Sequence, residues 1–523
     1  MRLDRLDARA LRDGLSRGEF SSEEVVRSLI ARADETEPRV NGFTVRLRDE
    51  ALAEARRADR DRARQGVRGP LHGLPITVKD NVDVAGLPST MGFAHLRSHR
   101  AGRDAAIVEA VRAAGAVVLG KSNVPQALVP MDCSNRPFGR THNPWSGAHV
   151  TGGSSGGEAA LLASGASVLG LGTDLGGSIR FPAAFCGVAG LKPTLDRWPN
   201  RGLRSPLRGQ EIVRAQVGPM ARSARDLALF FEAVSAGRLA GLDARVAPLD
   251  AVPHEGIDVA ALRIGWCGED GFFPPAPAMR RAVHEARDSL VALGAELVEV
   301  TLPDQAEIVA CYLAGTSSDG MRTLKEAFAG EPPVPALRTL WAAGSVPRWA
   351  RRAVAWGLDG AGEERLAWIV RSTGERRAAA LWRLADERTR RVAAEIDWWR
   401  DERLDALILP ASASPAVPIG MDHDFSLIFS YFGRFNLTGF PGGVVPATRV
   451  RASEAHLPLD GDRFERRAAA VAARSAGLPV AVQVVGRPWH ESVVLAVLVA
   501  IEEAAHARGE APRVPVDPFV LQG

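Results

Sequence analysis

The chain has 523 residues, 46% hydrophobic and 24% charged, which predicts a soluble globular protein with a large core and excludes a disordered chain. Its 65 Lys and Arg nearly balance its 62 Asp and Glu, and a net charge of only +3 argues against nucleic-acid binding. No apolar run reaches the about 18 residues that cross a bilayer, and the N-terminal stretch lacks the apolar segment of a secretion signal.

The cysteines point to the same kind of protein. Cys133, Cys186, Cys267 and Cys311 are scattered along the chain without CxxC spacing. This pattern predicts neither a disulfide framework nor a zinc site. We therefore expect a cytoplasmic protein without a bound metal.

Helices are expected over the first 65 residues. Ser21 and Glu24 form a capping-box pattern at the start of a segment with apolar residues at helical spacing. This predicts a helix that begins at the capping box and ends at Pro38.

The next 100 residues alternate between strand and helix patterns. Residues 75–84 alternate apolar and polar positions between glycine and proline, which predicts a strand that contains Lys79. Within residues 104–126 an amphipathic helix precedes a short buried strand at 116–119. A polar, glycine-rich stretch follows, and then an alanine-rich helix is expected at 157–168. This alternation is typical of α/β folds with a central sheet.

The second half of the chain has fewer glycines at first and then returns to mixed patterns. Residues 225–400 are predicted to be mainly helical, with a long helix near 378–402 that leads into a strand. Residues 477–505 predict a strand, a turn and a helix. No internal repeat or low-complexity tract is present.

A glycine-rich strip around one serine, "GLGTDLGGSIRFP", occupies residues 170–182. Because Gly176 and Gly177 have no Cβ, the backbone N–H groups near Ser178 can converge on one point, as in an oxyanion hole. A phosphate cradle is the competing interpretation, but neither GxxxxGK[ST] nor GxGxxG is present here. A plain tight turn also remains open.

Two further groups are candidates for chemistry. The stretch "TGGSSGG" contains a weak G-x-S-x-G match at Ser154, so a Ser-His-Asp hydrolase that uses one of the 11 histidines stays open. Lys79 is either a solvated charge paired with Asp80 or a buried base. Burial beside Ile76 and Val78 would lower its pKa and leave a neutral amine.

Three segments together, "GLPITVKDN" (73–81), "GGSSGG" (152–157) and "GTDLGGSIRFPAAFCGVAGLKPT" (172–194), resemble the amidase signature family. The resemblance implies a central mixed β-sheet flanked by helices on both faces, and a Ser–cis-Ser–Lys triad without a cofactor. It places the nucleophile at Ser178, the bridging serine at Ser154 and the base at Lys79. It further implies an oxyanion hole from Leu175, Gly176, Gly177 and Ser178, and a role in holding this loop for Ser155, Asp174 and Arg180.

Within that family, the segments around the motifs resemble the fatty acid amide hydrolases more than the A subunits of glutamyl-tRNA amidotransferases. These segments cover residues 124–145, 209–222, 435–450 and 476–495. The resemblance implies a serine amidase that hydrolyses small-molecule N-acyl amides with a hydrophobic or fatty acyl group. Apolar residues just before the serine cluster are expected on the acyl side, with core packing as their alternative: Leu128, Val129 and Met131.

The alternatives are an amidotransferase A-type subunit, a general small-amide or aryl amidase, and a non-catalytic binding protein of the same fold. We expect one amidase domain over 1–523: helices at 1–65, a catalytic core at 70–230, a mainly helical substrate-side region at 231–400, and completion of the sheet at 401–510. A homodimer is a further expectation.

Peripheral membrane contact is expected near Trp349 and Trp356, which lie in a basic stretch at residues 345–360. A basic helix with interfacial tryptophans can lie on a membrane surface. An ordinary packed surface helix is the alternative interpretation of this stretch.

Overall fold

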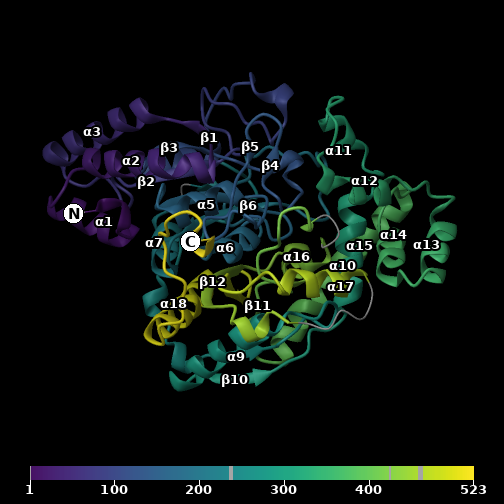
Figure 1. Ribbon diagram of the computed structural model, residues 1–523. Coiled ribbons are helices and arrows are strands. Elements are labelled where there is room, and N and C mark those ends of the chain that lie inside the picture. Colours follow the sequence, from purple (N-terminus) through teal and green to yellow (C-terminus); the bar gives the residue numbers. More distant parts are fainter. Residues whose placement is uncertain (1, 235–238, 423–425, 457–462, 523) are drawn as a thin grey trace.

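The computed structural model describes residues 2–234, 239–422, 426–456 and 463–522, and one mixed sheet runs through these parts of the chain (Figure 1). β2 is parallel to β3 and β6, whereas β12 is antiparallel to both of its neighbours. In spatial order the 11 strands are β1 (Phe43–Arg46), β3 (Val117–Ser122), β2 (Pro75–Lys79), β6 (Leu169–Asp174), β8 (Gln216–Ala221), β7 (Ala189–Lys192), β12 (Gly442–Arg449), β13 (Pro479–Gly486), β11 (Ala406–Pro410), β9 (Arg263–Trp266) and β10 (Glu296–Glu299).

Helices cover both faces of this sheet, as two neighbouring glycines of β12 show. Side chains of consecutive strand residues point to opposite faces. A Cβ at Gly442 would meet Arg180, the first residue of α6 (Arg180–Cys186), whereas one at Gly443 would meet Leu498 of α18 (Glu491–Ala507). α5 (Gly156–Ser164) packs beside α6, and α7 (Ala224–Ala233) and α9 (Pro277–Ala292) pack beside α18. The predicted α/β fold with helices on both faces is confirmed.

The N-terminal helices form as the sequence predicts, with one difference at an end. Ser21 and Glu24 make the reciprocal capping-box hydrogen bonds that start α2 (Ser22–Val40). Pro38 does not end this helix; it lies in the last turn, and the chain leaves the helix at Asn41, which adopts the left-handed conformation. The other helices in this part are α1 (Ala8–Arg17), α3 (Arg48–Gln65) and α4 (Ala106–Ala113).

The strand that carries Lys79 is shorter than predicted. β2 stops at Lys79 because the chain turns there: the N–H of Val82 donates to the carbonyl of Lys79, and the Asp80 carboxylate accepts two N–H groups of the following loop. The neighbouring β3 runs three residues further than the predicted 116–119. α5 ends at Ser164, before the predicted 168, because Gly165 is left-handed.

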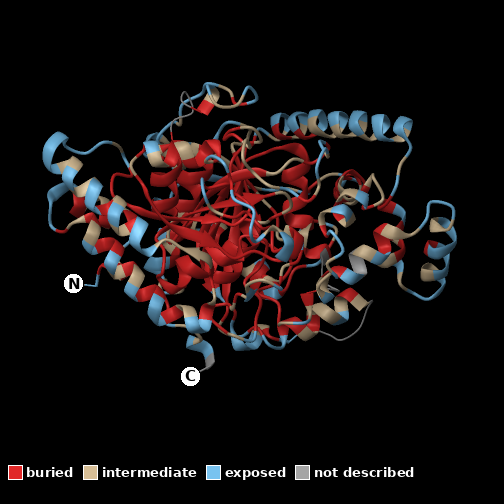
Figure 2. Cartoon of the chain, turned by 90° about the horizontal axis from the view of Figure 1, so that it is seen from above, coloured by how far each residue is buried: buried red, intermediate tan, exposed pale blue. Residues whose placement is uncertain are grey.

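The middle of the chain is mainly helical, but it also holds two strands that the sequence pattern did not predict. β9 and β10 extend the far edge of the sheet beside β11. α13 and α14 project from the body of the molecule (Figure 1), and α15 is a long, mostly exposed helix (Figure 2). The helices are α10 (Gln305–Ser317), α11 (Arg322–Ala327), α12 (Arg338–Ser345), α13 (Arg351–Gly360), α14 (Glu364–Ser372), α15 (Ala378–Asp401), α16 (Ser430–Thr438) and α17 (Arg463–Ala472).

The four cysteines are buried, and none of them is in a disulfide. Among the helices of the described ranges, none combines the length and the apolar character needed to cross a membrane. Two-residue strands, β4 (Ser134–Asn135) and β5 (Gly139–Arg140), make a small hairpin within the predicted polar, glycine-rich stretch.

Candidate active site

Lys79 lies at the carboxyl end of β2, between β3 and β6, and is fully buried. Its Nζ is 2.8 Å from Oγ of Ser154, 2.9 Å from Oγ1 of Thr173 and 3.2 Å from the Thr173 carbonyl oxygen. Thr173 is on β6, and Ser154 lies two residues before α5. The pairing of β2 with β6 therefore places the Lys79 amine beside Thr173, and the loop before α5 brings Ser154 to the same atom.

The protonation of Lys79 follows from this position. Burial lowers its pKa from 10.5 to about 7, and this effect outweighs the opposing charges of Asp174, Glu158 and Asp80. A neutral amine has two N–H groups and one lone pair. Because the Thr173 carbonyl can only accept, one N–H is used there, and the lone pair is available to the Ser154 hydroxyl.

The two serine segments are held against each other by the backbone. Ser155 N–H donates to the Ser178 carbonyl at 3.0 Å, and the Gly153–Ser154 peptide is cis. Ser154 is buried, whereas Ser178 is half-buried and lines a cavity. A Cβ at Gly153 would lie 2.0 Å from the Pro130 carbonyl oxygen, so a glycine is required for this close approach.

The loop before Ser178 presents backbone donors to the same cavity. Gly177, at φ +102°, donates its N–H to Oδ1 of Asp174 at 2.7 Å, so that donor is already engaged. The N–H groups of Leu175, Gly176 and Ser178 meet no acceptor within the described ranges of the chain. Three donors therefore remain for an oxyanion.

A fully buried ion pair fixes this loop. Asp174 accepts from Nε and Nη2 of Arg180, both at 3.0 Å, and from Asn436 at 2.9 Å. Arg180 also donates to Gln483 at 2.7 Å and lies 4.6 Å from the centroid of the Phe432 ring. Burial alone would raise the pKa of Asp174, but the Arg180 charge and these donors hold it well below its ordinary value. Sequence reasoning placed Asp174 and Arg180 together but missed Asn436 and Gln483.

The cavity has a volume of about 230 Å³ and a mostly apolar wall. Leu128, Val129 and Met131, the predicted acyl-side residues, line it together with Ser178. Further wall residues come from α10, α12 and α14, which lie in the region 231–400 expected on the substrate side, and from two segments around Phe429 and around Phe464; sequence reasoning named no individual residue in these parts.

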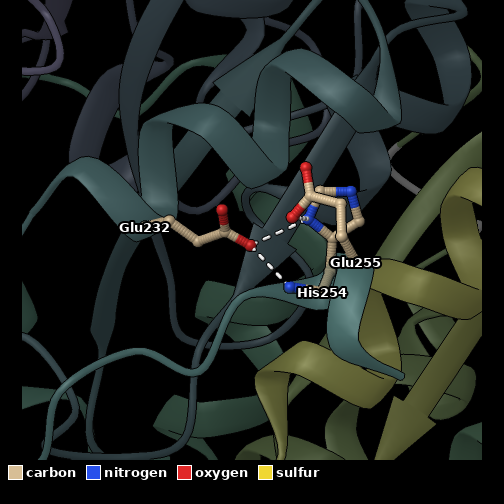
Figure 3. Close-up of side chains that lie close together, drawn as sticks. All are labelled: Glu232, His254 and Glu255. Atoms are coloured by element: carbon tan, nitrogen blue, oxygen red, sulfur yellow. Dashed lines mark hydrogen bonds and ion pairs between the residues drawn. The ribbon is translucent and has the colours of Figure 1, made fainter.

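A second cluster of titratable groups lies around His254 (Figure 3). Its Nδ1 is 2.8 Å from Oε1 of Glu232 and 3.1 Å from Oε2 of Glu255, and its backbone N–H donates to the same Glu232 oxygen. This arrangement ties the turn at His254–Gly256 to the end of α7. None of the three residues lines the cavity at Ser178.

The fold and the site together define an enzyme that acts on amide bonds, and the comparisons with known proteins identify its family. A family model described as Amidase matches residues 24–495. The chain therefore belongs to the amidase signature family of hydrolases.

Relatives within the family differ in what they act on. The chain is 36% identical over 493 residues to fatty-acid amide hydrolase 1 of Sus scrofa, covering 93% of this chain and 83% of that protein. It is 33% identical to the A subunit of glutamyl-tRNA(Gln) amidotransferase from Nitratidesulfovibrio vulgaris, covering 95% and 96%. A solved structure of a fatty acid amide hydrolase superposes with a TM-score of 0.83 at 24% identity, covering 96% of this chain and 85% of that one.

Proposed function

We propose that the protein hydrolyses N-acyl amides with a hydrophobic acyl group, using Lys79, Ser154 and Ser178 as a proton relay and nucleophile. The observation that carries this proposal is a fully buried Lys79 Nζ at 2.8 Å from the Ser154 hydroxyl, next to a half-buried Ser178 that opens on an apolar cavity. Relatives that share the family support an amide substrate.

The proposed reaction begins with neutral Lys79, which takes the Ser154 proton as Ser154 takes that of Ser178. Ser178 Oγ then bonds to the amide carbonyl carbon, and the carbonyl oxygen becomes an oxyanion that accepts from the free N–H groups of the loop. The relay returns the proton to the leaving amine as the C–N bond breaks. Water, activated by the same relay, releases the acid from Ser178.

The wall of the cavity supports a hydrophobic acyl group. Three hydroxyl-bearing residues of the wall donate to backbone carbonyls one turn earlier: Thr316 to Tyr312, Ser317 to Leu313 and Thr373 to Ile369. These hydroxyls therefore compete little for polar groups of a substrate, and an acyl chain gains by leaving water.

A hydrolysis profile across acyl chain lengths, with a constant amine, tests the substrate. We expect kcat/KM to rise from acetamide to medium and long chains; faster turnover of acetamide-sized amides contradicts the proposal.

Fluorophosphonate labelling followed by mass spectrometry tests the nucleophile. We expect label on Ser178, none in S178A, and slower labelling in S154A at the same serine. Label on Ser154 instead would favour a Ser-His-Asp scheme.

An amidotransferase A-type subunit is the second candidate, because the chain is 33% identical to one over almost its full length. Such a subunit releases ammonia from an amide for a partner. Hydrolysis of acyl amides by the isolated chain, with no release of ammonia from glutamine, would exclude this candidate. A preference for anilides over alkyl amides would instead favour an aryl amidase.

We also propose peripheral membrane contact through the projecting helices. Trp349 is 86% exposed and Trp356 79% exposed, whereas tryptophan is on average highly buried in folded proteins. The predicted helix at 345–360 begins only at Arg351, so Trp349 lies in the turn before α13. Arg348 and Arg352 beside these tryptophans are exposed and favour an anionic surface.

A further inference from the structure

The loop that carries the free backbone donors is contacted by a tyrosine from a helix far along the chain. The hydroxyl of Tyr312, on α10, donates to the Leu175 carbonyl at 3.2 Å. A Cβ at Gly176 would lie 2.3 Å from this hydroxyl oxygen, so the phenol occupies the space above that glycine. Tyr312 is buried, and its ring packs against Phe429 with centroids 4.9 Å apart.

The hydrogen bond to Leu175 has a consequence for the next residue. In a trans peptide the C=O and the following N–H point in opposite directions in one plane. The Leu175–Gly176 peptide is trans, so a donor that fixes the Leu175 carbonyl also fixes the direction of the Gly176 N–H. That N–H is one of the three donors without an acceptor in the described chain.

Without this contact, no hydrogen bond among the described residues would hold the same peptide. Rotation of a peptide plane changes ψ of the first residue and φ of the second, and a glycine at the second position accepts nearly any φ. A flipped peptide would present the Leu175 carbonyl, rather than the Gly176 N–H, to a developing oxyanion. Gly176 therefore allows the Tyr312 hydroxyl to approach closely. Its own backbone preferences do not fix the direction of its N–H.

We infer that Tyr312 is a positioning residue that holds the Gly176 N–H toward the oxyanion of the reaction. This inference rests on the proposed function, because it assigns Gly176 to the oxyanion hole of Ser178. Tyr312 also lines the cavity, so its ring is in position to contact an acyl chain. Burial raises the pKa of Tyr312, which keeps the phenol protonated and able to donate.

The test is Y312F, which removes the hydroxyl and keeps the ring. The loss of one neutral hydrogen bond predicts a fall in kcat of about five- to tenfold, with KM nearly unchanged. A trifluoromethyl ketone with the same acyl chain forms an oxyanion on Ser178, so its inhibition constant should rise by the same factor. The affinity of the matching alcohol, which forms no oxyanion, should not change.

The chain has two tyrosines, and the second gives a matched control. Tyr431 is also buried and donates its hydroxyl to a backbone carbonyl, that of Phe273 at 2.7 Å, but it does not line the cavity. Y431F should therefore leave kcat and the inhibition constant unchanged. If both variants reduce kcat equally, or if Y312F raises KM alone, the inference is wrong.

A double-mutant cycle gives a second test that does not depend on Y312F alone. In G176A the added methyl group displaces the hydroxyl, so adding Y312F should reduce kcat little further. Multiplicative effects of the two changes contradict the inference. Fluorophosphonate labelling of Ser178 in the unmodified protein tests the proposed function separately from the role of Tyr312. If Ser178 is labelled and the Tyr312 variants behave otherwise than expected, only the role of Tyr312 is contradicted.

Discussion

Glu158 is a buried acid close to the base of the proposed relay. Its Oε2 accepts from Oγ1 of Thr77 at 2.5 Å, two residues before Lys79 on β2. Burial raises the pKa of Glu158 to about 7, so it and Lys79 change charge over the same pH range. When Glu158 is ionised, its charge favours the ammonium form of Lys79. The two groups are therefore an electrostatic pair, in which the charge of each favours the charged form of the other.

This pairing predicts the pH dependence of E158Q. In the proposed relay, neutral Lys79 is the active form, so kcat/KM should rise with pH through about 7. Removing the Glu158 carboxylate removes a charge that raises the Lys79 pKa, so the rise should move to lower pH. Because Glu158 is itself mostly protonated well below pH 7, the two proteins should differ near and above pH 7, where E158Q should have the larger neutral fraction of Lys79. A pH profile of kcat/KM measures this.

Glu502 provides the control for that profile. It is buried on α18, its pKa is raised to about 8 by burial, and its carboxylate accepts the Ala224 N–H. It is not among the charges that act on Lys79. E502Q should keep the profile in place. A shift of the same size in E502Q, or none in E158Q, contradicts the pairing of Glu158 with Lys79.

The helical segment from α12 to α14 combines two surfaces with different environments. Its inner side gives Ala343, Leu366 and Ile369 to the cavity, while the turn before α13 and α13 itself expose Trp349 and Trp356. A small apolar cluster of Ala343, Ala355, Ala367 and Val370 joins these helices. The segment can therefore contact a surface on one side and a substrate on the other.

The exposed tryptophans give a prediction for this segment. Burying about 100 Å² of each side chain in a bilayer interface contributes about 2.5 kcal/mol. W349A/W356A should therefore reduce binding to anionic vesicles at least tenfold in co-sedimentation, with hydrolysis of a short-chain amide unchanged. W382A removes a tryptophan of α15 that is as exposed as Trp356, at 79%, and this variant should retain vesicle binding. Equal losses in the two variants would indicate non-specific adsorption.

Across the whole molecule, the Asp174–Arg180 pair joins segments that are far apart in sequence. Gln483 on β13 is 303 positions from Arg180, and Asn436 on α16 is 256 positions away. The network thus connects the loop before Ser178 to the far half of the sheet. Its charges are fully buried, so each depends on the other for compensation.

Removing one member of this network should destabilise the protein strongly. R180M leaves Asp174 buried without its cation, and we expect a loss of about 3–5 kcal/mol in the free energy of unfolding measured in urea. The double variant R180M/D174N should lose less than the sum of the two single changes. R390M, which breaks an exposed pair with Glu387 on α15, should have no measurable effect.

The Asp174–Arg180 pair also predicts how the free energy of unfolding changes at acidic pH. The folded-state pKa of Asp174 is depressed, so its contribution is present above the unfolded value of 3.8 and is lost as the pH falls toward the folded value. Since R180M removes the main cause of the depression, its stability should fall less steeply on acidification. An equal slope in both proteins would contradict this assignment.

Local patterns in the sequence predicted much of the fold, and long-range contacts account for what was missed. The capping box of α2 and the glycine strips are short-range features, so they could be read directly. The family resemblance placed Lys79, Ser154 and Ser178 in one site, and their roles stay predictions. Tyr312, Asn436 and Gln483 carry no local signal, because their partners are set by how distant segments pair. β9 and β10 are only four residues each, which is too short for a clear alternation of apolar and polar residues.

The groups that would do the chemistry and those that would choose the substrate lie in different stretches of the chain. Lys79, Ser154 and Ser178 come from the first 180 residues, whereas much of the cavity wall comes from α10, α12 and α14. Replacements in these helices can therefore reshape the cavity without touching the proton path. Proteins of this architecture could therefore differ in preferred acyl group with Lys79, Ser154 and Ser178 unchanged, and an exchange of residues 313–373 between two of them, which leaves Tyr312 in place, should transfer selectivity.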